Sequence, residues 1–289
     1  MTSYNYGIYI RDAISSVMNQ SYQDWELIIV DDGSKDNSIE IINGFISENP
    51  QKIKLLTHLG NENKGIKQTN ELAFSNISGK YVAFLESDDV WKPNCLELKI
   101  SALKNNPEAV LAFSDLELLI DDGFDAERHQ NYLKYSRYIG NKCKKNPKSL
   151  ARMILFRNPI ISFSNIVIRS SILQDFSIIK EHEIWSDWQL VIHAAGLGKF
   201  IYVENKLLYW RLHRKSQNFH FIQSNINEKK HEFLKSVSRV INQKNMPKKY
   251  YYPFSFISKI YKVLHDLKFA ICYPNIVWTE FKRIDKNKL

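Results

Sequence analysis

The sequence lacks the features that would place it in several large classes of protein. No apolar run approaches the roughly 20 residues that a membrane-spanning helix needs, and the opening MTSYNYG lacks the basic and then apolar layout of a secretion signal. The only cysteines are Cys95, Cys143 and Cys272, with no CxxC pair, which argues against a disulfide framework and a cysteine-rich zinc site. We therefore expect a cytoplasmic globular protein.

Length and charge divide the chain into two predicted parts. The 289 residues, 44% of them hydrophobic, can form one large domain or one domain with an appendage. Residues 221–289 contain 14 Lys and Arg against 5 Asp and Glu, an excess equal to the net charge of +9 of the whole chain. We predict a domain over residues 1–220 and a basic, aromatic-rich helical extension over residues 221–289.

The basic extension has three interpretations. Its mixture of lysines and aromatics suits peripheral contact with an anionic membrane, which would place the protein at the inner face of the cell membrane. Equally, its aromatics could pack on the main domain while its lysines face water. Binding to nucleic acid is disfavoured, because no RNA- or DNA-binding motif accompanies the charge.

Strand and helix patterns alternate along the first 220 residues. The predicted strands cover residues 25–32, 52–58, 80–86, 109–115, 164–170 and 198–204. The predicted helices cover residues 8–20, 38–49 and 67–77. This alternation is typical of an α/β fold with a mostly parallel, Rossmann-like sheet that helices cover on both faces.

Acidic residues follow two of the predicted strands. Asp31 and Asp32 end the first strand, and the stretch FLESDD places Glu86, Asp88 and Asp89 at the end of the third. Ligands of an open parallel sheet bind beyond the carboxyl ends of its strands, so both groups are expected in one crevice. Each group alone could be a solvated turn or a helix cap. Together they favour a hard divalent cation, Mn²⁺ or Mg²⁺, with phosphate as a further ligand.

Three stretches of the sequence carry a resemblance to a known family. They are SYNYGIYIRDAISSVMNQSYQDWELIIVDDGSKDNS, NKGIKQTNELAFSNISGKYVAFLESDDVWKP and WSDWQLVIHAAGLGKFIYVENKLLYWRLHRKSQN. In this order they resemble the inverting family 2 glycosyltransferases, which have a GT-A fold. The resemblance implies transfer of a sugar from a nucleotide-diphosphate donor, a UDP-sugar, to a hydroxyl of a glycan or lipid-linked glycan acceptor in cell-surface polysaccharide synthesis.

The resemblance also implies how the donor is held. Four residues match positions that bind the nucleotide base and ribose: Tyr4, Asn5, Asp31 and Asp32. An arginine that many members use near the diphosphate is missing, and Lys64 or Lys67 is expected to substitute for it.

The resemblance assigns the metal to the second acidic group. Asp88 and Asp89 match the DxD-type pair that holds the ribose and the metal on the diphosphate, and His213 matches a histidine that reaches the metal or the diphosphate. Glu86 stands where the family usually has aspartate. The ion would stabilise the leaving group as a Lewis acid.

Asp187 matches the catalytic aspartate of the family. Direct displacement at the anomeric carbon needs a carboxylate that takes the acceptor's proton as its oxygen attacks. Asp187 precedes a helical pattern, so it could also be an N-cap residue, and both roles are compatible.

One departure from the family concerns the start of the fold. Members open with an apolar strand before the segment that matches Ser3, Tyr4 and Asn5, and here only Met1 and Thr2 precede it. The first strand is therefore expected to be missing, which favours the alternative that the protein is a catalytically impaired homologue that binds a glycan or a partner. A nucleotidyltransferase is disfavoured, because no basic, glycine-rich phosphate loop lies near the N-terminus.

Overall fold

The computed structural model describes residues 1–121, 124, 126–145, 158, 160–173 and 186–216. The predicted extension over residues 221–289 lies outside these residues, so its helical structure and the boundary at residue 220 stay predictions. In the part that the structure describes, no helix is both long and apolar enough to cross a membrane.

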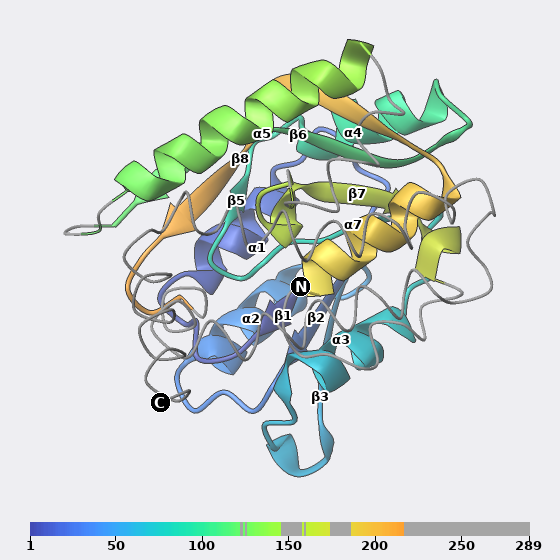
Figure 1. The fold of residues 1–289 in the computed structure, drawn as a ribbon. Helices are drawn as coiled ribbons and strands as arrows, with labels where there is room; N and C mark the ends of the chain where they lie inside the picture. Colours follow the sequence, from blue (N-terminus) through green and yellow to red (C-terminus); the bar gives the residue numbers. More distant parts are fainter. Residues whose placement is uncertain (122–123, 125, 146–157, 159, 174–185, 217–289) are drawn as a thin grey trace, which may run out of the picture. The chain divides into compact units, whose positions relative to one another are not determined.

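The first part of the chain forms a parallel sheet with the order β1-β2-β3 (Figure 1). Its strands are β1 (Thr2–Ser3), β2 (Leu27–Asp31) and β3 (Ile53–Thr57). The helices α1 (Ile10–Met18) and α2 (Ser38–Glu48) connect them, and α3 (Gly65–Phe74) follows. The apolar residues at helical spacing in α1, Ile10, Ile14 and Val17, are all buried in the core, as the periodicity predicts.

A second, mixed sheet has the order β4-β7-β6-β8-β5. Its strands are β4 (Tyr81–Ala83), β5 (Val90–Trp91), β6 (Ala109–Ile120), β7 (Ile166–Arg169) and β8 (Lys199–Leu212). Only β6 and β8 pair in parallel, and the other neighbours are antiparallel. The α/β class is confirmed, but the expectation of a mostly parallel sheet holds only for the first three strands. The reason is that β7 inserts between β4 and β6 against the direction of both.

Three further helices belong to this half of the chain. They are α4 (Cys95–Lys104), α5 (Glu127–Lys145) and α7 (Ser186–Leu197), together with the short 3-10 helices Leu59–Asn61, Phe163–Asn165 and Ser170–Leu173. Figure 1 shows α5 lying along β6 and β8, which it contacts. The sequence did not predict α5, because the helix is polar apart from a narrow stripe that buries Leu133, Ile139 and Cys143.

The expectation that the first strand is missing needs correction. Thr2 and Ser3 form a short β1 that pairs with Val30 and Asp31 at the end of β2. The Met1 amino group extends this contact, because its nitrogen donates to the Ile28 carbonyl at 2.9 Å. The strand is therefore present, but it covers only the last part of β2, whereas β3 pairs with all five of its residues.

A buried lysine ties the second sheet together. Lys99 of α4 is fully buried, and its Nζ donates to the carbonyl of Asn165 at 2.9 Å and to its Oδ1 at 3.0 Å. The same Asn165 bonds the backbone N–H and carbonyl of Ser114 in β6. Burial lowers the pKa of Lys99. The contacts join α4, β6 and the turn before β7 beneath the candidate site.

Candidate active site

Asp31 and Asp32 are both held by hydrogen bonds from the polypeptide itself. Asp31 is fully buried and accepts from the backbone N–H of Ser34 at 2.8 Å and from its hydroxyl at 2.6 Å. Asp32 accepts from the N–H groups of Lys64 at 2.7 Å and Gly65 at 3.0 Å, at the start of α3. These donors satisfy both carboxylates at the end of β2.

The loop after β1 is fixed to the same region. Asn5 has a positive φ of 55°, its N–H donates to the hydroxyl of Ser34 at 2.9 Å, and its Oδ1 accepts from the N–H of Lys35 at 2.8 Å. The neighbouring Tyr4 keeps 38% of its surface exposed. Asn5 therefore joins the loop after β1 to the loop after β2, while the Tyr4 ring is exposed and available to a ligand.

A small pocket of about 140 Å³ lies between these loops and the acidic stretch after β4. Tyr4, Asp32, Asp88 and Arg211 line it. Of the predicted donor-binding residues, Asn5 and Asp31 are not among the lining residues, and both hydrogen-bond Ser34. The Lys64 side chain pairs with Glu62 on the surface, so its expected contact with the diphosphate stays a prediction.

Glu86, Asp88 and Asp89 form a close acidic cluster. Each offers a carboxylate oxygen, and the three oxygens lie within 4.8 Å of one another. Oδ2 of Asp88 lies 3.0 Å from Nε2 of His213. The His213 ring is buried beside Tyr9, with 4.4 Å between ring centroids, and its Nδ1 has no hydrogen-bond partner among the described residues.

Asp89 anchors the cluster to two remote segments. It is fully buried, and its carboxylate accepts from the N–H of Arg211 in β8 at 2.9 Å and from the hydroxyl of Ser162 at 2.8 Å. The Ser162 hydroxyl also lies 2.9 Å from the carboxylate of Glu86. Ser162 holds this bridging position with a φ of 61°, which few residues other than glycine adopt.

The cluster is electrostatically costly. Burial and the neighbouring charge of Asp88 raise the pKa of Asp89 to about 7. Burial, followed by the charges of Asp89 and Asp88, raises the pKa of Glu86 well above its usual value. Like charges so close together favour either protonation or a bound cation.

The residues of the cluster fit a divalent cation. Carboxylate oxygens suit Mg²⁺ and Mn²⁺, and imidazole is acceptable to Mn²⁺. Asp88 and His213 lie at hydrogen-bond distance, and both would exchange this contact for the ion in order to hold it. Asp89 would have to release a hydrogen bond to become a ligand itself, because both of its oxygens accept one.

The Arg211 side chain forms a hydrogen bond and ion pairs with acidic residues. Its Nε donates to the carbonyl of Asp88 at 2.8 Å, and its other nitrogens lie 2.9 Å from Asp12 and 3.5 Å from Asp121. Its side chain is only 11% exposed. The arginine therefore connects α1, the acidic loop and β8 at the edge of the pocket.

Asp187 lies in the first turn of α7, on a second and much larger cavity of about 1070 Å³. The side-chain amide of Asn158 donates to its carboxylate at 3.2 Å. Burial raises the pKa of Asp187 to about 6. Because α7 begins one residue earlier, Asp187 is already inside the helix and not at the N-cap position that the alternative proposed.

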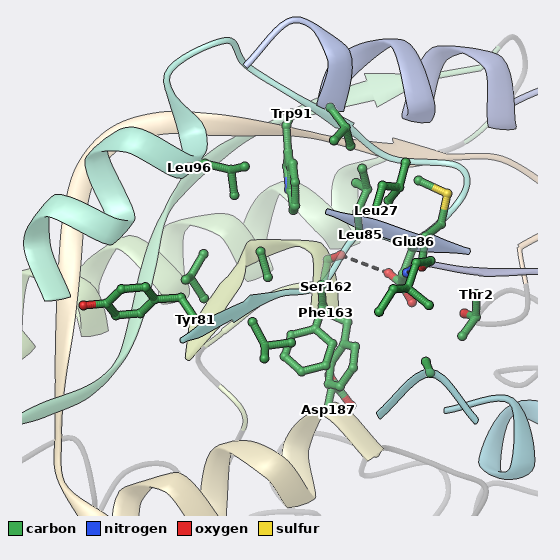
Figure 2. Close-up of a pocket in the computed structure, with 18 of the residues that line it drawn as sticks. Thr2, Leu27, Tyr81, Leu85, Glu86, Trp91, Leu96, Ser162, Phe163 and Asp187 are labelled. Carbon is green, nitrogen blue, oxygen red and sulfur yellow. Dashed lines mark hydrogen bonds between the residues drawn. The ribbon is translucent and has the colours of Figure 1, made fainter. Parts of the chain in front are cut away.

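The small pocket and the large cavity meet at the acidic cluster. Glu86 lines both of them, whereas Asp88 lines only the first and Asp187 only the second. Figure 2 shows Ser162 bonded to Glu86, with Asp187 below Phe163 on the same cavity. The structure thus brings together the acidic loop after β4, the strand end of β2 and the start of α7.

The model of glycosyl transferase family 2 matches residues 1–176, which is more than half of the chain. The chain belongs to glycosyl transferase family 2.

Individual relatives, which are glycosyltransferases by name, agree with this assignment. An uncharacterized glycosyltransferase of Nostoc sp. is 31% identical over 218 residues, which cover 74% of this chain and 63% of the relative. The Escherichia coli UDP-Glc:alpha-D-GlcNAc-diphosphoundecaprenol beta-1,3-glucosyltransferase WfgD is 33% identical over 207 residues, which cover 69% of this chain and 79% of that enzyme. The chain spans less than two thirds of the length of the Nostoc relative.

A solved structure shows the same fold. The crystal structure of S. aureus TarS 1-349 in complex with UDP-GlcNAc matches with a TM-score of 0.64 at 17% identity, over 86% of this chain and 67% of that one. The fold that the resemblance implied for this family 2 chain, GT-A, is therefore confirmed.

Two residues of the candidate site were not predicted from the sequence. Ser162 bridges Glu86 and Asp89, and Asn158 holds Asp187. Both lie in or beside the apolar stretch PIISFSN, where only their polarity among apolar neighbours sets them apart. That signal is too general to assign a role, because buried serines and asparagines are common wherever a hydrogen bond is available.

Proposed function

We propose that this family 2 chain is an inverting, metal-dependent glycosyltransferase that moves a sugar from a nucleotide-diphosphate donor to an acceptor hydroxyl. The observation that carries the proposal is the position of Glu86 at the junction of two cavities. One cavity offers groups for a nucleotide and a diphosphate, and the other offers Asp187. A reacting anomeric carbon at this junction would have leaving group and acceptor on different sides, as direct displacement requires.

The small pocket is proposed to hold the nucleotide. The Tyr4 ring supplies a stacking surface, and Asp32 supplies oxygens with lone pairs that remain after its two hydrogen bonds to α3. Asn5 and Asp31 would fix the loops around the base and ribose, while Lys64 would have to leave Glu62 to reach the diphosphate. The names of WfgD, a UDP-Glc enzyme, and of the TarS complex with UDP-GlcNAc support a UDP-sugar as the donor.

Asp88, Asp89 and His213 are proposed to hold Mn²⁺ or Mg²⁺, with Glu86 beside them. When bound, the ion supplies positive charge that offsets the charge on the departing diphosphate. The surrounding residues keep the carboxylates in place, because Ser162 and the backbone of Arg211 both hold Asp89. Among the described residues, Nδ1 of His213 has no hydrogen-bond partner, and Nε2, which lies 3.0 Å from Asp88, is the ring nitrogen that would reach the ion.

Asp187 is proposed to be the general base. With a pKa of about 6, its carboxylate is mostly ionised at neutral pH and is still basic enough to accept a proton. Asn158 fixes its orientation toward the large cavity, from which the acceptor hydroxyl would approach. The proton moves from this hydroxyl to the Asp187 carboxylate as the new glycosidic bond forms.

The acceptor is proposed to be a glycan or lipid-linked glycan of a cell-surface polysaccharide, reached at the inner face of the membrane. The acceptor in the name of WfgD, a sugar on diphosphoundecaprenol, supports this class, as does the basic composition of residues 221–289. Removing those residues should lower co-sedimentation with anionic vesicles and leave the background with neutral vesicles unchanged. Equal sedimentation of both forms with anionic vesicles rejects membrane contact.

The test of catalysis compares two variants across a panel of donors. UDP-, GDP- and dTDP-sugars are screened for Mn²⁺-dependent hydrolysis and thermal stabilisation of the protein. Asp187→Asn should keep donor binding and lose transfer by roughly a thousandfold, whereas Glu108→Gln, which removes a carboxylate paired with Lys199 on the surface, serves as the control. Normal transfer by Asp187→Asn would remove the base assignment.

A catalytically impaired binding protein is the second candidate, and the short β1 favours it, because β1 pairs in register only with Val30 and Asp31 of β2. This candidate is supported if donors raise the thermal stability of the unmodified chain but are neither hydrolysed nor transferred with any metal.

A further inference from the structure

The second half of α5 presents a row of basic side chains to solvent. Lys134, Lys142 and Lys145 are exposed, and Tyr138 between them keeps 55% of its surface exposed. Residues three or four positions apart are neighbours on a helix surface, so these four side chains lie on one side of α5. We call them the basic face of α5.

Other cations in this part of α5 are paired within the protein. Arg137 lies 2.7 Å from the carboxylate of Asp115 in β6, and Lys144 lies 2.6 Å from that of Glu204 in β8. The three lysines of the basic face have no such acidic partner among the described residues. Their charge is therefore available to a ligand outside the chain.

The charge of α5 is also of one sign. Its sequence contains six Lys and Arg and a single acid, Glu127, which is its first residue. A helix that only faces water usually carries charges of both signs at helical spacing. Lys142 and Lys145 instead repel each other across one turn, and a bound anion would relieve that repulsion.

The charge of the chain disfavours its own segments as the occupant of this face. Residues 221–289 hold an excess of nine positive charges, and a second copy of the chain would also bring a net charge of +9. Both would be repelled by exposed lysines. The occupant is therefore expected to be a separate anionic partner.

The shape and chemistry of the basic face favour a lipid surface over other anionic partners. The row from residue 134 to residue 145 runs for about 17 Å along one helix, which suits a flat surface. The Lys142 ammonium lies 4.7 Å from the centre of the Tyr138 ring. Tyrosine is enriched where lipid meets water, and lysines beside it attract anionic headgroups.

The first half of α5 borders the proposed acceptor site. His129 and Tyr132 line the large cavity together with Asp187. The Tyr132 hydroxyl donates to the carbonyl of Asn158 at 2.7 Å, and the side chain of Asn158 holds Asp187. One helix thus carries both an exposed basic face and part of the cavity wall.

We infer that the basic face of α5 binds the anionic headgroups of a lipid bilayer. This contact would hold the large cavity close to the bilayer from which a lipid-linked acceptor is taken. The choice of that acceptor rests on the proposed function, whereas the lipid contact can be measured without donor or acceptor.

The experiment follows acetylation of individual lysines in the full chain by mass spectrometry. Vesicles that contain phosphatidylglycerol should slow acetylation of Lys134, Lys142 and Lys145 about fivefold compared with phosphatidylcholine vesicles. Lys54 of β3 and Lys104 of α4 are exposed as well and serve as the reference in the same sample. Their acetylation should change by less than about twofold, because they lie outside the contact.

A pair of variants separates this face from the basic extension. Lys142→Gln with Lys145→Gln should lower the partition of the full chain onto anionic vesicles by at least about tenfold. The matched control, Lys54→Gln with Lys104→Gln, removes the same charge and should lower it by less than about threefold. An equal loss in the two variants would show that only net charge matters and would overturn the inference.

Two further results would also overturn it. One is acetylation of the basic face that is as fast with anionic as with neutral vesicles, even when the chain co-sediments with them. The other is protection of these lysines by single-stranded RNA at the same phosphate concentration and not by vesicles, which would assign the face to nucleic acid. Failure of the proposed catalysis, seen as normal transfer by Asp187→Asn, changes neither measurement.

Discussion

The two acidic sites follow the same kind of buried strand, but they hold their charge in different ways. After β2, Asp31 and Asp32 receive hydrogen bonds from Ser34 and from the start of α3. After β4, the carboxylates face one another, and the pKa of Asp89 is raised to about 7. The carboxylates of the first site are satisfied by donors of the polypeptide, whereas those of the second would be stabilised by the proposed cation. Acidic residues at the end of a strand can therefore either hold neighbouring loops in place or bind a cation. The number of hydrogen-bond donors around them distinguishes the two cases.

The largest difference is expected when one charge of the second site is removed. Asp88→Asn should reduce Mn²⁺-dependent donor hydrolysis by at least about a hundredfold, because it removes a ligand and its charge. Without metal, its Tm should stay level or rise, since the change relieves repulsion on Asp89 and Glu86. Hydrolysis assays and thermal melts with Mn²⁺ or chelator measure both effects. A metal-free Tm that falls by many degrees would show that Asp88 is a structural carboxylate like those of the first site.

The corresponding change at the first site should act on stability. Asp32→Asn places an amide NH₂ against the N–H groups of Lys64 or Gly65, so one buried donor loses its acceptor. We expect a loss of about 2 kcal/mol in the free energy of unfolding, measured by urea denaturation, with the Mn²⁺-induced rise in Tm preserved. Loss of that metal response at unchanged stability would reverse the roles of the two sites.

A third carboxylate, Asp187, differs from both acidic sites, because its protonation should control the pH dependence of transfer. Its pKa is raised to about 6 by burial, and the base must be ionised, so transfer should fall as the pH drops below 6. The rate at pH 5 should be roughly tenfold below the plateau. Rates with saturating donor and Mn²⁺ between pH 5 and 8 measure this, and chemical rescue of Asp187→Asn by formate should flatten the profile. A rate that is constant over this range would assign the proton transfer elsewhere.

Most of what could be predicted from the sequence is local. The apolar run before Asp31 identifies the end of β2, whereas β4 ends at Ala83, before the predicted strand end at residue 86. Pairing between distant segments could not be predicted in this way. Ser162 meets its acidic partners 76 and 73 residues away in the chain, and β7 enters the second sheet against the direction of its neighbours. Neither arrangement leaves a periodic pattern, because it depends on which edges are free once the helices have packed.

Lys99 constrains the order in which the chain can close during synthesis. Its ammonium is satisfied by Asn165, which emerges from the ribosome 66 residues later. Until then, packing α4 against the sheet would bury the Lys99 ammonium in an apolar interior without a hydrogen-bond acceptor from Asn165. A nascent chain shorter than this must keep α4 hydrated, so the acidic loop next to it can acquire its final shape only when translation has passed the turn before β7.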